Sequence, residues 1–118
     1  MILFQKGKRL FTDVRVANTF RKRFFGLMGR KRMGADEALL LIGCSGIHTC
    51  FMRFAIDVVY LDADYKVLYR QTVAPWRIGR FVKGAKHVVE VAKGKAEAVE
   101  IGLPVEIGNT ERKRYCDE

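Results

Sequence analysis

The stretch CSGIHTCFMRFAIDVVYLD, residues 44–62, holds the residues of this chain that are best suited to chemistry. It places His48, one of two histidines, between two cysteines and runs Asp57 through an apolar segment. An unpaired buried carboxylate is very costly, so Asp57 needs a cation, a set of backbone N–H donors or a raised pKa. Asp57 is therefore either a general base or ligand, or an anchor for Arg53, Arg77 or a turn. Because buried polar groups are usually satisfied structurally, we favour the anchor.

Cys44, His48 and Cys50 do not have the spacing of a metal site. Zinc sites take about four N or S ligands, and only three candidates are present here, with Cys44 in a turn rich in glycine. A Cys–His nucleophile pair lacks an orienting Asn or Asp that a motif would reveal. We therefore expect no metal ion and no cofactor. A hydrolase that uses His48 and Asp57 remains the catalytic alternative to a binding site.

Four arginines lie beside aromatic residues or glycines at the ends of expected elements, where the rims of pockets form. They are Arg23, Arg30, Arg53 and Arg77. Arginine presents a rigid fork of donors that suits a carboxylate or a phosphate. If two or three of these side chains converge near His48, they form an anion pocket. If each pairs with an acid such as Asp13, Asp57 or Glu90, they are structural clamps, and the sequence leaves both possibilities open.

Length and composition indicate one globular domain. The chain has 118 residues, of which 49% are hydrophobic and 30% charged, a balance typical of folded proteins. We expect one domain over residues 1–108 and a polar, disordered tail over 109–118. The apolar run 38–42 is far shorter than the roughly 20 residues that a membrane span requires. No secretory signal is recognisable at the N-terminus, so we expect a cytoplasmic protein without a membrane span.

The net charge of +9 comes from the first third of the chain. Residues 1–35 hold ten Lys or Arg and one Asp, whereas residues 36–118 hold twelve of each sign. A concentrated basic field attracts anionic partners, and weak nucleic-acid binding through residues 6–32 is a further alternative. No known nucleic-acid-binding module is recognisable, so a solvated basic face is the simpler interpretation.

The pattern of apolar residues predicts a mainly β protein, α+β by count, with one short N-terminal helix near residues 18–28. Alternation predicts strands at 2–4 and 10–16, and ALLLI (38–42) is a buried strand candidate. The segment 47–62 has the strongest strand signal, although it is too long for one uninterrupted strand, and it forms a hairpin with 67–73. Its residues 54–61 are apolar on both faces. Later segments read as a loop at 76–86, a strand at 87–92, a helical turn or strand at 96–102 and a last strand at 104–108. Many short strands with frequent turns favour a β-sandwich or barrel.

Several of these segments resemble a known family. ANTFRKRFFGLMGR, CSGIHTCFMRFAIDVVYLD, VAPWR, HVVEVAKG and IGLPVEIG are similar to the prokaryotic domain-of-unknown-function family 192, over about residues 9–108. The resemblance implies a small jelly-roll-like sandwich, and it implies no activity, cofactor or catalytic residue. The family usually has glycine at the hairpin position of Tyr65, where tyrosine would resist a positive φ.

We expect a non-catalytic binding module for a small anionic ligand or an acidic protein partner. The segments GLMGR, IHT and PWR would form its site. Arg30, Arg53 and Arg77 would bind charge, His48 would hydrogen-bond, and Met52 with Trp76 would supply apolar contact.

Overall fold

The structure is a computed structural model that describes residues 1–17, 27 and 30–108. Its strands, in chain order, are β1 (Ile2–Gln5), β2 (Lys8–Phe11), β3 (Asp13–Ala17), β4 (Glu37–Leu41), β5 (Ile56–Leu61), β6 (Val67–Val73), β7 (His87–Ala92) and β8 (Glu106–Gly108). The helical element of this described part is a 3-10 turn, η1 (Lys95–Ala98). No helix there has the length and apolar content to cross a bilayer. The chain is thus mainly β, as expected.

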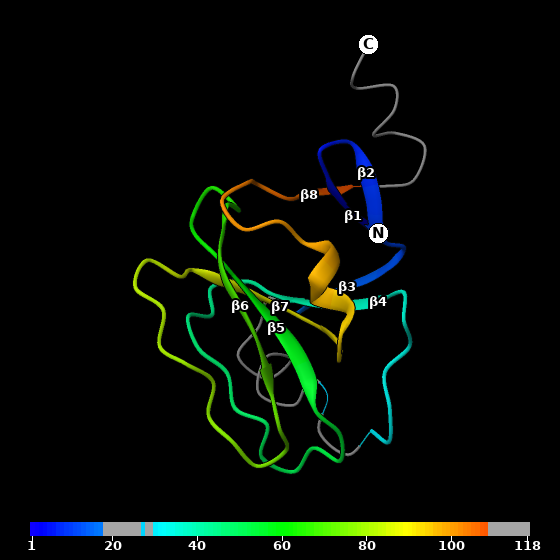
Figure 1. Cartoon of the computed structure of the whole chain (residues 1–118), viewed down its shortest axis with the longest axis vertical. Helices are drawn as coiled ribbons and strands as arrows, with labels where there is room; N and C mark the ends of the chain where they lie inside the picture. Colours follow the sequence, from blue (N-terminus) through cyan, green and yellow to red (C-terminus); the bar gives the residue numbers. More distant parts are fainter. Residues whose placement is uncertain (18–26, 28–29, 109–118) are drawn as a thin grey trace.

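The strands form two sheets. A small antiparallel sheet has the order β2-β1-β8, and a larger one has the order β3-β4-β7-β5-β6. Figure 1 shows the small sheet at one end of the molecule and long loops at the other. The sheets remain separate, and the larger one contains a parallel pair, β3 with β4. The mainly β class is therefore confirmed, whereas a closed barrel or jelly roll is not seen.

Strand β5 is an interior strand of the larger sheet, between β7 and β6, and all six of its residues are buried. Val59 and Leu61 face a core that the small sheet covers, together with Leu3 and Phe11. Ile56, Val58 and Tyr60 face the opposite core. The prediction of a strand apolar on both faces is confirmed for 56–61.

Loops cover the second face of β5. Residues 43–55 and 74–86, here called the covering loops, contribute Ile47, Met52 and Ala85 to the core that Tyr60 also joins. Gly79 lets the second loop lie directly on the sheet, since a Cβ there would stand 2.7 Å from the Tyr60 hydroxyl oxygen. The described part of this face is therefore covered by irregular chain rather than by a sheet.

Some predicted boundaries were wrong for a physical reason. The expected strand 10–16 is split, because β2 ends at Phe11 and β3 begins at Asp13 in the other sheet. Of the segment 47–62, only 56–61 forms β5. The part before it belongs to a covering loop, joined to the second loop at the bridge between His48 and Ile78. Apolar residues that cover a sheet give the same pattern as residues within one.

Other predictions are confirmed. The hairpin joins β5 and β6, the strand over 87–92 is β7, and the turn near residue 96 is η1. Tyr65 adopts φ 65° in the hairpin, the conformation that tyrosine resists, and its ring packs on His87 at a centroid distance of 4.7 Å. The expected helix at 18–28, apart from Leu27, lies outside the described residues, as do Arg23 and the tail 109–118.

Candidate functional site

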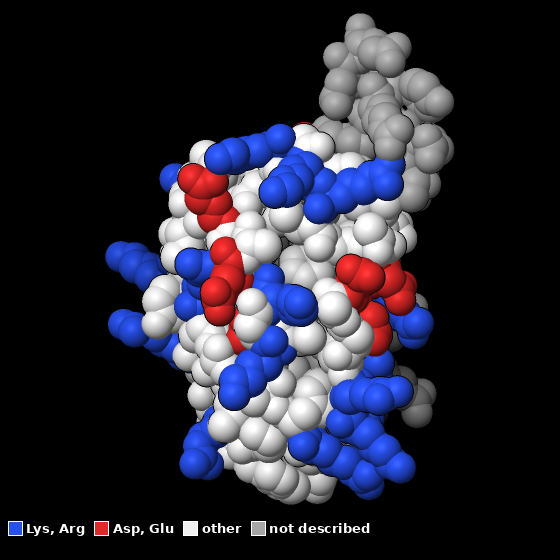
Figure 2. All heavy atoms as spheres, turned by 45° about the vertical axis from the view of Figure 1, so that its right-hand side comes forward, with Lys and Arg blue, Asp and Glu red and all other residues white. Residues whose placement is uncertain are grey.

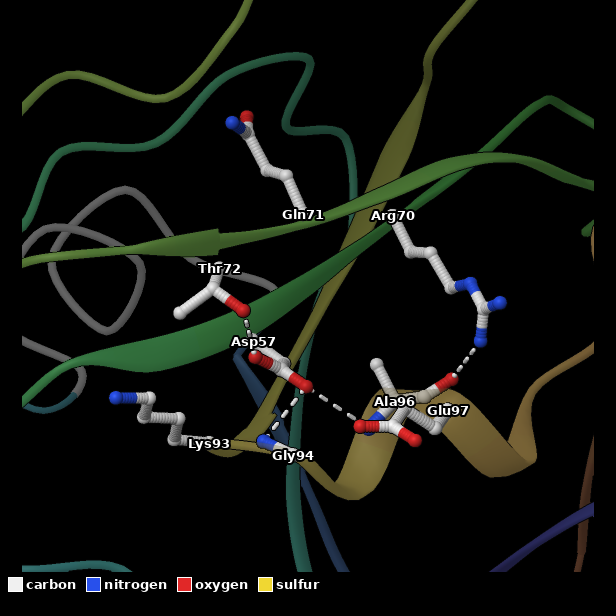
Figure 3. Close-up of a pocket in the computed structure, with 8 residues that line it drawn as sticks. All are labelled: Asp57, Arg70, Gln71, Thr72, Lys93, Gly94, Ala96 and Glu97. Carbon is white, nitrogen blue, oxygen red and sulfur yellow. Dashed lines mark hydrogen bonds between the residues drawn. The ribbon is translucent and has the colours of Figure 1, made fainter.

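Asp57 is an anchor between the buried strand β5 and a turn. Its side chain is 4% exposed and accepts hydrogen bonds from the Thr72 hydroxyl (2.7 Å) and from the backbone N–H groups of Gly94 (2.9 Å) and Ala96 (3.1 Å). Figure 3 shows the three contacts converging on the carboxylate. Backbone donors thus satisfy the carboxylate as they would in a helix cap. Asp57 thus has the hydrogen bonds expected of an anchor, and they come from Thr72 and the turn instead of Arg53 or Arg77.

His48 and Asp57 form hydrogen bonds with different parts of the chain. The Nδ1 atom of His48 accepts the N–H of Cys50 at 3.3 Å, and its backbone pairs with Ile78. Among the hydrogen bonds of the described residues, none joins His48 to Asp57. The described residues also contain no group of three or more His, Cys, Asp or Glu able to hold a metal ion.

Thr49 ties the two covering loops together. It is fully buried, and its backbone N–H donates to the Arg77 carbonyl at 2.8 Å while its own carbonyl accepts from Trp76 at 2.9 Å. Its hydroxyl donates to the Ala74 carbonyl and accepts from the Arg77 N–H at 2.8 Å. These bonds make the first loop and the second one a single unit. Sequence patterns did not reveal this role, because one threonine among loop residues carries no periodicity.

Phe51 and Trp76 form an exposed aromatic pair on this unit. Their ring centroids are 4.6 Å apart with the planes tilted by 57°, and the side chains are 59% and 56% exposed. Both residues have positive φ, 66° for Phe51 and 61° for Trp76. Bulky residues rarely adopt this conformation, and such strain gathers at functional sites. The chain therefore holds two large rings at the surface at a conformational cost.

The surface around this pair is apolar and basic. Ile78 is 82% exposed and Phe81 is 80% exposed. Residues 43–56 contain one Lys or Arg, residues 74–86 contain four, and neither range contains Asp or Glu. In the face that Figure 2 presents, acidic side chains lie in the upper and middle parts and none lies at the lower end, where Figure 1 places the covering loops. We call the exposed residues of 47–53 and 74–83 the loop surface.

The predicted arginines divide into two groups. Arg30 forms a double hydrogen bond with Glu37, at 3.0 and 2.9 Å, and is a structural clamp. The hydrogen bond from the Gly34 N–H, and to a smaller extent the Arg30 guanidinium, lowers the pKa of Glu37 below its ordinary value. Burial acts in the opposite direction and raises this pKa. Arg53 and Arg77 are exposed, and neither forms an ion pair with any described residue. They lie in the covering loops with His48 and Trp76.

Met52 differs from the expectation in its exposure. It is 4% exposed and packs in the core beneath the loop surface, so it supports this surface from within. Phe51, Ile78, Phe81 and Arg80 were missed by sequence reasoning. The absence of acids over residues 43–56 and 74–86 was the available signal, but charge counted over whole thirds of the chain concealed it.

Glu90 is a buried acid that sequence reasoning considered only as an arginine partner. It is 5% exposed and lies opposite Leu39 and Val58 on neighbouring strands, so it shares the apolar face under the covering loops. Burial raises its pKa to about 8. Burial also raises the pKa of Tyr60 on this face to about 12. The Glu90 side chain is therefore mostly neutral at pH 7.

The model of the DUF192 family, described as an uncharacterized ACR, matches residues 1–107. The chain belongs to the DUF192 family. A UPF0127 protein of Pyrococcus furiosus is 37% identical over 112 residues, which cover 92% of this chain and 93% of the relative.

Two solved structures are similar to this DUF192 chain. A protein of unknown function from Novosphingobium aromaticivorans has a TM-score of 0.77 at 18% identity and covers 90% of this chain and 82% of its own. A Sinorhizobium meliloti protein, provisionally named a transcription regulator, has a TM-score of 0.68 at 19% identity and covers 79% of both chains. At these identities the likeness shows the fold alone.

Thr49→Val should destabilise the DUF192 chain by about 1–3 kcal/mol, because it leaves the Ala74 carbonyl and the Arg77 N–H without their hydroxyl partner. Urea unfolding measures the change. Thr12→Val is the control, since Thr12 is exposed and such substitutions usually change stability by less than about 0.5 kcal/mol. Equal stability of the two variants would contradict the role of Thr49.

Glu90→Gln should flatten the dependence of stability on pH. The folded pKa of about 8 exceeds the ordinary value of 4.5, so the folded chain retains a proton that the unfolded chain releases. Wild-type stability should therefore fall as the pH rises from 4.5 to 8, and the variant should be more stable by at least about 1 kcal/mol at pH 9. Urea unfolding from pH 4.5 to 9, with the exposed Glu97→Gln as control, tests it. Parallel wild-type and Glu90→Gln profiles would exclude a raised pKa.

Proposed function

We propose that this chain is a non-catalytic binding module that takes an acidic protein partner on its loop surface. The observation that carries the proposal is the exposed pair of Phe51 and Trp76, held at positive φ on a unit tied together by Thr49. A rigid aromatic pair costs a partner little ordering entropy on binding. Tryptophan and arginine are also the residues that most often dominate binding energy at protein interfaces.

The charge of the loop surface specifies the sign of the partner. Arg53, Arg77 and Arg80 lie in loops without an acidic residue. Such a surface attracts acidic partners and repels basic ones, because complementary potentials set both specificity and association rate. Arg53 and Arg77 would bind carboxylates, and Trp76 with Phe51 would supply apolar contact. His48 would donate or accept a hydrogen bond at the edge of the loop surface.

The apolar residues favour a protein over a small anion. Ile78 and Phe81 are each at least 80% exposed, whereas a small-molecule site encloses most of its ligand. A protein segment carrying both acidic and apolar side chains would use the arginines and the apolar residues together. Arg30 takes no part in this proposal, because Glu37 already neutralises it.

Nucleic acid is the alternative that an experiment must separate. The name of the Sinorhizobium meliloti protein refers to transcription, and exposed aromatic residues with arginine are also found where single strands bind. Bases stack on open ring faces, however, and here each ring of the pair packs against the other. Isoleucine offers no ring at all, so Ile78 favours an apolar side chain as its contact.

The test is fluorescence anisotropy at low and high salt. The probes are a labelled peptide of glutamate interspersed with leucine and phenylalanine, a glutamate-only peptide, a labelled dT oligonucleotide, and citrate as competitor. The mixed peptide should bind most tightly and more weakly as salt rises. Trp76→Ala and the double variant Arg53→Ala with Arg77→Ala should each weaken binding by about tenfold.

The double variant Lys8→Ala with Arg9→Ala is the matched control, because it removes two exposed cations of β2, outside the loop surface. It should change peptide affinity by less than about twofold, within screened surface electrostatics. Three results would each overturn the proposal: tighter binding of the oligonucleotide than of the mixed peptide, displacement of the peptide by citrate, or equal losses of peptide affinity in the two double variants.

A further inference from the structure

A second site lies on the opposite face of β5. A hollow of about 290 Å³ is lined by four charged side chains, Asp57, Arg70, Lys93 and Glu97. Asp57 lies opposite Val91, which belongs to the core on the side of the small sheet. The hollow is therefore separate from the loop surface, and Figure 3 shows it between β6 and the η1 turn.

Two of the four charges are held in fixed positions by the same residue. Asp57 accepts the N–H of Ala96, and the Arg70 Nη1 atom donates to the Ala96 carbonyl at 2.8 Å and to the Val99 carbonyl at 3.1 Å. The remaining donors of the guanidinium, on Nε and Nη2, form no hydrogen bond with any described residue. The Arg70 fork is thus oriented in advance for a further acceptor.

The four charges do not neutralise one another. No salt bridge within 4.0 Å joins any two of them in the described part of the chain. Lys93 and Glu97 are exposed, on either side of the Asp57 carboxylate in Figure 3. The hollow therefore offers two positive and two negative groups, two of them rigid and two adjustable.

We propose that this hollow binds a small zwitterion, namely a free α-amino acid. Arg70 would hold its carboxylate, and Glu97 with the remaining acceptor capacity of Asp57 would hold its ammonium group. The exposed Lys93 side chain, which extends away from Arg70 in Figure 3, would turn toward the carboxylate on binding. A volume of about 290 Å³ corresponds to about ten liquid waters at ~30 Å³ each. This is enough for a ligand of about ten non-hydrogen atoms.

The composition of the hollow disfavours other ligand classes. Two carboxylates repel a phosphate, and no aromatic residue lines the hollow to stack on a sugar ring. An uncharged ligand would make no use of the charges of Arg70, Lys93 and Glu97. Because the hollow is small and polar, the affinity should be modest, with a dissociation constant of about 1–10 mM.

The test is a ¹H–¹⁵N correlation titration that follows the Gly94 and Ala96 amides. The probes are glycine, alanine, serine and glutamate at constant ionic strength, with acetate and ethylamine as half-ligands. The amino acids should shift both amides in a saturable way, and each half-ligand should bind more weakly. Lys93→Ala and Glu97→Gln should each weaken binding by about two- to fivefold.

Lys95→Ala is the matched control, because Lys95 is exposed in the same turn but does not line the hollow. It should leave the affinity unchanged. Three results would overturn the proposal: no saturable shift, equal shifts from acetate and the amino acids, or equal losses in the Lys93 and Lys95 variants. None of these results bears on the peptide binding proposed for the loop surface.

Discussion

The burial of β5 on both faces is the constraint from which the rest of the structure follows. A strand whose side chains are all buried needs a cover on each side of its sheet. The small sheet supplies one cover, and the covering loops supply the described part of the other. Asp57, the one acid in this strand, tolerates burial because Thr72 and the η1 turn donate to it. The polar residue therefore fixes the turn instead of weakening the core.

A cover made of loops has consequences for the outer surface. Ile47 and Met52 face inward, and Thr49 secures the loops through backbone and hydroxyl bonds. Phe51 and Trp76 are consequently not required for the core, and more than half of each side chain is exposed. Strained backbone at such a place is the observation that supports the partner proposed for the loop surface.

The sequence predicted what periodicity and turn chemistry encode. Strand β7 and the hairpin with β6 followed from the pattern of apolar residues, and the burial of Asp57 followed from the apolar residues on both faces of its strand. The cost of a buried charge then predicted that Asp57 has partners. The limits of β5 did not follow, since Ile47 and Met52 look like strand residues although they cover the sheet. The partners of Arg30 and Asp57 depend on Glu37 and the η1 turn, which folding brings close. The loop surface was foreseen in Arg53, Trp76 and Arg77, but its neighbours in space were not.

Backbone strain beneath the aromatic pair is the central claim, and a comparison of glycine with alanine at each site measures it directly. Both substitutions at Phe51 or Trp76 remove the ring, and only glycine accepts positive φ without a steric penalty. Urea unfolding should show each glycine variant to be more stable than its alanine counterpart by about 1 kcal/mol. If the alanine variants were equally or more stable, the loops would not be holding these residues under strain, and the account would be contradicted.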